Sequence, residues 1–237
     1  MSRWGAGRGA SAPEGSDASV LAVVVADGEP ASEDAGVARR ADLLVAADGG
    51  ARWLAAQGLR PNLVVGDLDS LDRREIERLQ ESGARVVPQP AEKDASDTEL
   101  AVEAAITAGA DRIVLVGAFG GSRVDHELAN LMLLVEPGFS QVDLRLQRSS
   151  TLVRGISGNR SLVIEAEVGE TVTLLPLGSD AIGVSTRGLR YALDQETLLM
   201  GRSRGLSNVV IGQPASVSIR AGSLLVIEIG KSMEGES

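Results

Sequence analysis

The 237-residue sequence contains no cysteine, which excludes disulfide bonds, thiol catalysis and zinc sites with cysteine ligands. Aromatic residues make up only 2% of the chain, so its core must be built from valine, leucine, isoleucine and alanine. Apolar runs stay shorter than the roughly 18 residues that a membrane-spanning helix needs. We therefore expect a cytoplasmic globular protein that does not enter a membrane.

Positive charge is scarce as well. Asp and Glu number 33 against 23 Lys and Arg, which gives a net charge of −10. We expect no nucleic-acid or membrane-surface partner, because those surfaces are themselves negatively charged. A negatively charged substrate would need a metal ion or a local basic group. The chain has one histidine, His126, and two lysines, Lys93 and Lys231.

Short apolar runs alternate with helical patterns over residues 20–140. Strands that are apolar on both faces and alternate with helices indicate a mostly parallel sheet covered on both sides. The sequence thus predicts an α/β, Rossmann-like domain, in which ligands bind beyond the C-terminal ends of the strands. The expected strands are 19–28, 41–50, 61–70, 83–90 and 111–121, and the expected helices are 51–58, 72–83, 97–109 and 124–136.

The pattern changes after about residue 140. Residues 141–232 form short runs with a period of two, separated by glycine and serine, and no long helical pattern interrupts them. We expect a second, all-β domain there, a β-sandwich or alternatively a small barrel. Residues 1–19 are rich in glycine, alanine and serine and have no signal-peptide pattern, so we expect a disordered tail.

The segment "GDLDS" at 66–70 places two aspartates, Asp67 and Asp69, after an expected strand. If the chain stays extended there, both side chains point the same way. Two close carboxylates repel each other unless a cation lies between them, and Mg²⁺ with a bound phosphate fits this role. The alternative is a helix cap, in which an aspartate or Ser70 begins the next helix.

The segment "EKDASD" at 92–97 follows another expected strand. Asp94 and Asp97 would flank the start of the next helix. Lys93 beside them is a candidate phosphate ligand, because its ammonium acts as a point charge. The alternative is a capping box from Ser96 to Glu99 with solvated charges around it, which leaves Lys93 and Asp94 unexplained.

The segment "GAFGGSRVDHELAN" at 117–130 joins a strand to a helix. Gly120 and Gly121 would let the backbone approach a phosphate at the helix start, and Arg123 would add donors. Asp125 and His126 fall in the first helical turn, where we expect His126 to be a structural partner of Asp125 rather than a catalytic base. An ordinary turn is the alternative interpretation of the glycines.

Asp48 and Gly49 repeat the pattern of strand, aspartate, glycines and helix in "ADGGARWL" at 47–54. Each segment is ambiguous alone. Because the C-terminal ends of parallel strands meet at one edge of a sheet, the segments together indicate a nucleoside triphosphate and Mg²⁺ held over that edge.

The combination of these segments resembles the bacterial thiamine pyrophosphokinase (thiamine diphosphokinase) family, over about residues 20–228. Two C-terminal segments are similar to the motif with which this family binds thiamine. The motifs that carry the resemblance are "DGG" at 48–50, "GDLDS" at 66–70, "EKDASD" at 92–97, "GGSRVDH" at 120–126, "TRGLRYAL" at 186–193 and "GRSRGLSN" at 201–208.

The resemblance implies transfer of a pyrophosphoryl group from ATP to the hydroxyl of thiamine, giving thiamine diphosphate and AMP. It also implies a homodimer with active sites between subunits, an α/β domain that holds ATP and Mg²⁺, and a β-sandwich that helps bind thiamine. The implied site residues are Asp67, Asp69 and Asp97 for catalysis and Mg²⁺; Asp48, Gly49, Lys93, Asp94, Gly120, Gly121, Arg123 and Asp125 for ATP and its phosphates; and Ser207 and Asn208 for thiamine.

The sequence departs from the family pattern at four positions. Asp27 stands where asparagine is common, Ser96 where threonine is common and Val209 where an acid is common, while Ser122 lengthens the glycine loop. Tyr191 lies within the thiamine-like segment, and we expect it in the core of the β domain, with stacking on thiamine as the alternative.

Other functions fit parts of the pattern. A pyrophosphokinase for another alcohol, such as a hydroxymethylpterin, would have the same ATP half. An Mg²⁺-dependent phosphohydrolase or an inactive nucleotide-binding module would also use the paired aspartates or the glycine loop.

Overall fold

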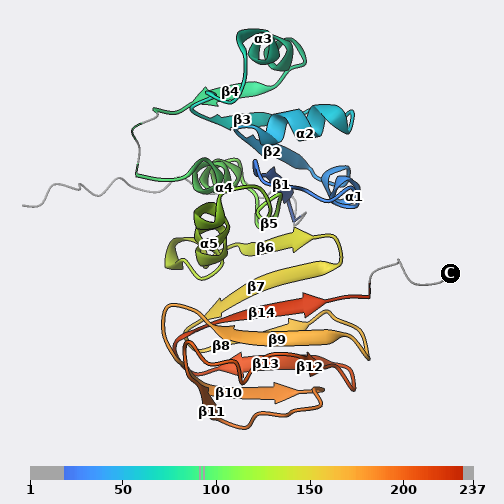
Figure 1. Cartoon of the computed structure of the whole chain (residues 1–237), viewed down its shortest axis with the longest axis vertical. Helices are drawn as coiled ribbons and strands as arrows, with labels where there is room; N and C mark the ends of the chain where they lie inside the picture. The colour runs from blue at the N-terminus through green and yellow to red at the C-terminus, as the bar shows by residue number, and fades with distance from the viewer. Residues whose placement is uncertain (1–18, 91, 93, 232–237) are drawn as a thin grey trace, which may run out of the picture.

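The computed structural model describes residues 19–90, 92 and 94–231, so the expected tail lies outside the described residues except for residue 19. Helices gather around one end of a long sheet, and the other end is built of strands alone (Figure 1). No helix within the described ranges is long and apolar enough to cross a membrane.

The N-terminal half of the sheet is parallel, as predicted. Neighbouring strands pair in the order β5-β1-β2-β3-β4, and all of these pairings are parallel. Each strand is shorter than its apolar run, because the flanking Asp and Gly residues belong to the loops. The strands are β1 Leu21–Val25, β2 Leu43–Ala47, β3 Leu63–Gly66, β4 Arg85–Pro88 and β5 Arg112–Val116.

Helices cover both faces of this parallel sheet. Alternate residues of β1 show the division: Ala22 and Val24 pack toward α4 and α5, whereas Val23 and Val25 pack toward α1 and α2. The four expected helices are confirmed, and the short helix α1 is an addition. The helices are α1 Asp34–Ala38, α2 Gly50–Ala56, α3 Arg73–Glu81, α4 Asp97–Thr107 and α5 Val124–Leu133, followed by the 3₁₀ helix η1 Pro137–Phe139.

Antiparallel pairing begins beyond residue 140, as the change of period predicts. Strand β6 pairs parallel with β5 on one side and antiparallel with β7 on the other, so one ten-stranded sheet runs through both halves of the chain. The expected domain limits stay a prediction. The strands are β6 Asp143–Arg148, β7 Thr151–Ser157, β8 Arg160–Ile164, β9 Thr171–Pro176, β10 Ala181–Arg187, β11 Glu196–Leu198, β12 Asn208–Val209, β13 Ala215–Ile219 and β14 Ser223–Ile229.

The C-terminal half has its own core. Strands β12, β9, β14 and β7 extend the long sheet, while β11, β10, β13 and β8 form a second, antiparallel sheet. Aliphatic side chains of both sheets form one buried cluster, which includes Leu174, Val217 and Leu224. Phenyl rings are missing from this cluster, consistent with the scarcity of aromatics in the chain.

A buried ion pair within the long sheet also forms hydrogen bonds to the second sheet. Arg154 on β7 donates from Nε to Glu228 of β14 at 3.1 Å and from its terminal nitrogens to Glu165 and the carbonyl of Val163. Glu228 in turn accepts the N–H groups of Glu165 and Ala166, at the end of β8. Because each charged group is bonded on several sides, the pair is tolerated in the interior and holds β8 beside the long sheet.

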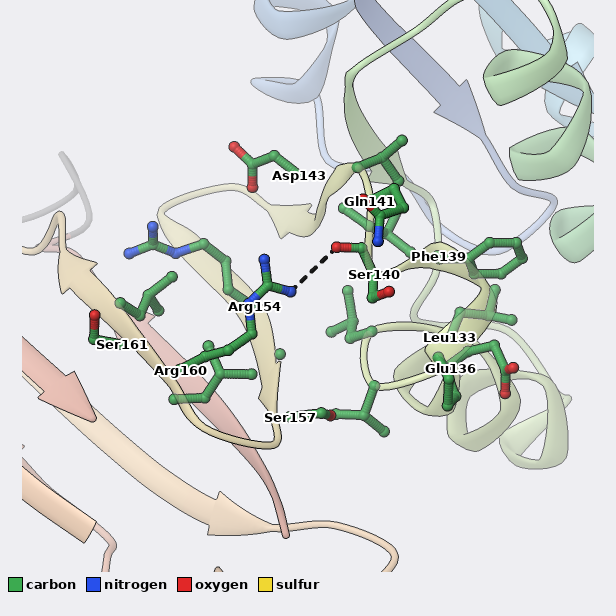
Figure 2. A pocket seen from close by; sticks show the side chains of 18 residues that line it. Leu133, Glu136, Phe139, Ser140, Gln141, Asp143, Arg154, Ser157, Arg160 and Ser161 are labelled. Carbon is green, nitrogen blue, oxygen red and sulfur yellow. Dashed lines mark hydrogen bonds between the residues drawn. The ribbon is translucent and has the colours of Figure 1, made fainter. Parts of the chain in front are cut away.

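A cavity of about 260 Å³ marks the seam between α5, η1 and strands β6–β8 (Figure 2). Across it, the Arg160 guanidinium donates to the carbonyl of Ser140 at 3.1 Å. Beside it, β7 approaches the end of α5 so closely that a Cβ on Gly155 would collide with the carbonyl oxygen of Leu134. Glycine at this position therefore sets how near the two segments can pack.

We expect Gly155→Ala to lower the free energy of unfolding by about 1–3 kcal/mol, because the backbone must shift to admit the methyl group. Urea unfolding measures the change. The matched control is Gly36→Ala on α1, where an added Cβ has open space, so its stability should be unchanged or slightly higher. Equal midpoints for Gly155→Ala and the unmodified protein would contradict the close approach.

Candidate active site

A pocket of about 470 Å³ lies where the parallel strands end. Loops after β1, β2, β3 and β5 and the first turns of α4 and α5 form its walls. The edge of the sheet at which the sequence predicts a ligand is therefore hollowed. The lining residues are Ala26, Asp27, Gly28, Ala47, Asp48, Asp67, Asp69, Asp97, Thr98, Gly117, Ala118, Gly120, Gly121, Ser122, Arg123, His126, Glu127 and Asn130.

Three carboxylates of this pocket converge. One oxygen each from Asp48, Asp67 and Asp69 lies within 4.8 Å of the others. The Oδ1 atom of Asp48 is buried without a hydrogen-bond partner among the described residues. Oxygen ligands in this number suit a hard divalent cation, which would also satisfy the buried oxygen. The residues present therefore fit Mg²⁺, with Asp48 beside the predicted pair.

The two predicted aspartates are brought together by a turn, and the expectation of an extended chain is wrong. Leu68 between them has a φ of 62°, in the left-handed region. Asp67 Oδ1 accepts the N–H of Asp69 at 3.2 Å, which closes the turn. A side-chain hydrogen bond of this kind competes with extended structure, which the two-residue spacing alone does not reveal.

The predicted cap at Ser70 is also wrong. Asp72 is the N-cap of α3, and its carboxylate accepts the N–H of Glu75 at 2.8 Å. Glu75 accepts the N–H of Asp72 at 2.7 Å, which completes a capping box. At α4, in contrast, Ser96 is the N-cap and accepts the N–H of Glu99, which is one of the two hydrogen bonds of the capping box that the alternative interpretation proposed.

Close backbone packing brings the acidic loops together. Gly66 has a φ of 153°, and a Cβ there would meet Asp97 Oδ1 at 3.0 Å and the Cβ of Asp48 at 3.1 Å. Asp48 itself has a φ of 44°, and its N–H bonds the carbonyl of Val65 at 2.9 Å. Strained backbone of this kind persists where its surroundings hold it and is common at functional sites.

Burial raises the pKa of the Asp48 carboxyl above its ordinary value. The hydroxyl of Ser70 lowers the same pKa, but by less than burial raises it. The carboxylates of Asp97, Asp27 and Asp67 add to it, because like charges disfavour ionisation. The pocket therefore carries a concentration of negative charge that a bound cation would relieve.

Asp27, which departs from the family pattern, is a further site residue that was not predicted from the sequence. It lines the pocket, and its carboxylate lies where a Cβ on Gly49, the N-cap of α2, would be. Burial raises its pKa, Arg52 lowers it, and Asp69 raises it further. Its place at the end of a strand, like that of the other acids, is the signal that could have identified it.

Arg52 links the helices beside this cluster. Its guanidinium donates to both oxygens of Glu75, at 2.9 and 3.0 Å, and so ties α2 to α3. The hydrogen bond from Arg52 lowers the pKa of Glu75 to about 2. Neither residue was singled out from the sequence, because an ion pair between two helices depends on their packing.

The glycine loop is held in place by the loop after β1 and by α5. The N–H of Gly28 bonds the carbonyl of Gly117 at 2.9 Å, which pins the two loops together. From α5, Glu127 accepts the N–H of Gly120 at 2.7 Å, and Asn130 donates to the carbonyl of Ala118. Gly120 and Gly121 adopt φ values of 87° and 85°, which favour glycine.

Arg123 and Asp125 form a pair at the pocket's rim. The guanidinium donates to both carboxylate oxygens, at 2.9 and 2.7 Å, and this contact lowers the pKa of Asp125 to about 2. Asp125 thus pairs with Arg123 instead of the expected partner, His126. His126 is itself one of the residues that line the pocket.

The other described residues of the predicted site lie outside the pocket lining. Lys93 lies outside the described residues, and Asp94 is exposed and away from the lining. Ser207 and Asn208 lie at β12, the edge of the long sheet opposite β4 (Figure 1). Tyr191, expected in the β core, is 63% exposed, so that expectation is wrong.

A parallel sheet with clustered carboxylates and a glycine loop at its C-terminal edge is typical of Mg²⁺-dependent enzymes that act on nucleotide phosphates. The chain matches the family models "Thiamin pyrophosphokinase, catalytic domain" over residues 36–146 and "Thiamin pyrophosphokinase, vitamin B1 binding domain" over residues 161–224. It belongs to the thiamine pyrophosphokinase family.

Individual relatives agree with this assignment. A thiamin pyrophosphokinase family protein from Enterococcus faecalis has a structure with a TM-score of 0.76 and 31% identity, covering 90% of this chain and 100% of that one. The thiamine pyrophosphokinase of Bacillus subtilis is 26% identical over 185 residues, covering 78% of this chain and 86% of the relative. The structure of the Bacillus subtilis protein shares the fold, with a TM-score of 0.78 over 89% of this chain and 99% of that one.

We expect Asp67→Asn to weaken Mg²⁺ binding, measured by calorimetry without nucleotide, by at least the roughly 10- to 100-fold that outer-shell substitutions cause. Removing one of three converging carboxylates removes both a ligand and a charge. Glu103→Gln, an exposed change on α4, is the control and should bind Mg²⁺ like the unmodified protein. Equal affinities in all three proteins would rule out Asp67 as a ligand.

Proposed function

We propose that this protein transfers a pyrophosphoryl group from ATP to the hydroxyl of thiamine, giving thiamine diphosphate and AMP. The observation that carries the proposal is the convergence of Asp48, Asp67 and Asp69 in a chain that also matches a vitamin B1 binding model. The converging acids suit a metal-bound polyphosphate. The match to the vitamin B1 binding model indicates thiamine as the molecule that accepts the pyrophosphoryl group. A pyrophosphokinase for a hydroxymethylpterin would share the converging aspartates but would not match a vitamin B1 binding model.

In the proposed reaction, the thiamine hydroxyl oxygen attacks the β-phosphorus of ATP in line. An O–P bond forms as the bond from the β-phosphorus to the α,β-bridging oxygen breaks, and AMP leaves with that electron pair. Positioning and charge neutralisation supply most of the rate in such transfers. Mg²⁺, when held by Asp48, Asp67 and Asp69, offsets the charge of the phosphates.

The chain's own residues divide the remaining tasks. Asp97, the first residue of α4, is proposed to accept the proton of the thiamine hydroxyl. Gly120 and Gly121 let the backbone approach the phosphates, and Arg123, oriented by Asp125, adds positive charge at the rim. Lys93 keeps its proposed role as a phosphate ligand on sequence grounds alone.

We further propose a homodimer with active sites between subunits. Supporting it, α5 exposes an apolar stripe at helical spacing: Val124, Leu128 and Met132 are 63%, 54% and 57% exposed. A contiguous exposed stripe of this kind is typical of an interface, and this one starts beside the pocket. We also propose that the N-terminal half is a Rossmann-like domain, that the C-terminal half is a β-sandwich, and that the protein is cytoplasmic.

Incubation with ATP, Mg²⁺ and thiamine should yield AMP and thiamine diphosphate in equal amounts. We expect Asp67→Asn and Asp97→Asn to reduce AMP formation by about 100-fold or more, because a ligand or a base is lost. Glu103→Gln serves again as the control. Phosphate release without thiamine would favour a hydrolase, and near-normal turnover in Asp67→Asn would refute the assigned role.

Leu128→Arg should convert the protein to a monomer in light-scattering measurements, because it places a charge in the proposed apolar interface. The same variant should lose thiamine-dependent AMP formation, since each site would lack its second subunit. Glu81→Arg, a change at an exposed position of α3, is the control. A fully active monomer would argue against sites between subunits.

A further inference from the structure

A second groove lies between α2 and α3, toward the β4 end of the long sheet (Figure 1). Its volume is about 590 Å³, within the usual range of small-molecule sites. The floor is apolar: Ala51 and Leu71 belong to the core beneath, and Leu59 and Leu79 pack against that core. Within the described part of the chain, the groove shares no lining residue with the acidic pocket, so the proposed reaction does not use it.

Positive charge surrounds this floor. Arg52, Arg60 and Arg78 line the groove, and all three are exposed. Glu75 is the one acidic residue among the described residues of the lining. The chain as a whole has a net charge of −10, so three arginines against one glutamate make the groove a local excess of positive charge. Guanidinium groups in such a place suit a phosphate or a carboxylate.

Two of these arginines lie at one end of the groove. Arg52 donates to both oxygens of Glu75, and this hydrogen bonding is the main cause that lowers the pKa of Glu75 to about 2. The charge of Arg78 contributes to the same shift. Arg78 donates from Nε to the carbonyl of Arg74 at 3.2 Å, a bond that engages one of the five N–H groups of its guanidinium.

The floor of the groove is bonded directly to the acidic loops. The N–H of Ala51 donates to the carbonyl of Asp48 at 3.2 Å, and the N–H of Leu71 donates to the carbonyl of Leu68 at 3.1 Å. Leu68 is the left-handed residue in the turn of the paired aspartates. A ligand that packs on Ala51 and Leu71 therefore contacts segments that hold the converging carboxylates.

Electrostatics gives this connection a sign. Burial raises the pKa of Asp27 in the acidic pocket, and Arg52 lowers it, so the positive charge of Arg52 acts on that pocket. An anion bound beside Arg52 would offset this charge. The acidic pocket would then attract a cation more strongly, because less positive charge opposes it.

We propose that the groove between α2 and α3 binds an organic anion, with an apolar ring body and a phosphate or carboxylate group, and that this anion tightens Mg²⁺ binding in the acidic pocket. The ring lies on the leucine floor, and the anionic group bonds Arg78 beside Arg52. The binding site is independent of the proposed function, whereas the coupling rests on the proposed Mg²⁺ site. Because such coupling is reciprocal, Mg²⁺ tightens anion binding by the same factor.

The fluorescent dye 8-anilinonaphthalene-1-sulfonate tests the binding site, because it joins an apolar ring body to one anionic group. We expect the protein to bind one dye per chain, with a Kd raised roughly tenfold in Arg78→Gln by the loss of charge-assisted hydrogen bonds. Ala55→Phe should abolish binding by filling the groove. Arg74→Gln changes an exposed residue outside the lining and is the control, with unaltered binding.

A dye that binds Arg78→Gln and Ala55→Phe as tightly as it binds the unmodified protein would lie elsewhere, for example on the apolar stripe of α5, and would overturn the proposal. Absence of dye binding to the unmodified protein would overturn it as well. Should Ala55→Phe fail to fold, Arg78→Gln against Arg74→Gln decides the outcome.

Calorimetry tests the coupling. Saturating dye should lower the Kd for Mg²⁺ about fivefold or more in the unmodified protein, and it should leave this Kd unchanged in Ala55→Phe, which cannot hold the dye. High salt should weaken the effect, because it screens the charges. Equal Mg²⁺ affinities with and without bound dye would overturn the coupling. Failure of the unmodified protein to bind Mg²⁺ would refute the proposed metal site, while the dye measurements still decide the groove.

Discussion

The double pairing of β6 supports the rest of the molecule. Its hydrogen bonds run parallel to β5 on one edge and antiparallel to β7 on the other, so a helix-covered sheet passes into a strand-only half without a break. Gly155, at the seam, lets β7 reach the end of α5. Because one sheet carries both halves, the acidic pocket and Tyr191 are held at a set separation.

Electrostatic repulsion between carboxylates is the main feature of the pocket at the end of the parallel strands. Asp48, Asp67 and Asp69 converge against their mutual repulsion, and the backbone holds them there through left-handed residues and a close approach at Gly66. A bound divalent cation would relieve this repulsion, because it places positive charge between the carboxylates. Arg52 and Glu75 hold α2 and α3 against the rim of the same cluster.

The acidic pocket and the surface beside β12 differ in their chemistry. At the parallel edge, the converging carboxylates suit a divalent cation, which a bound polyphosphate would share. Beside β12, Tyr191 is exposed, and the buried amide of Asn208 holds its backbone through two hydrogen bonds. The proposed homodimer would cover the apolar stripe on α5, which begins at the pocket and faces solvent in the single chain.

Much of this protein could be predicted from its sequence, because local patterns carry the information. The period of the apolar residues determined the strands, the helices and the change to antiparallel pairing after residue 140. The acids and glycines at strand ends identified Asp67, Asp69, Asp97 and Gly120 as neighbours, since parallel strands bring their C-terminal ends to one edge.

Other features depended on contacts between segments far apart in the chain, which no local pattern encodes. Tertiary packing decided that β6 joins the two halves and that Asp72 caps α3. It also decided that Asp27 lines the pocket and that the amide of Asn208 forms hydrogen bonds with the backbone of Tyr191. The residue types were visible in the sequence, but their partners were set by how the loops fold over the sheet edge and by which backbone groups needed a hydrogen bond.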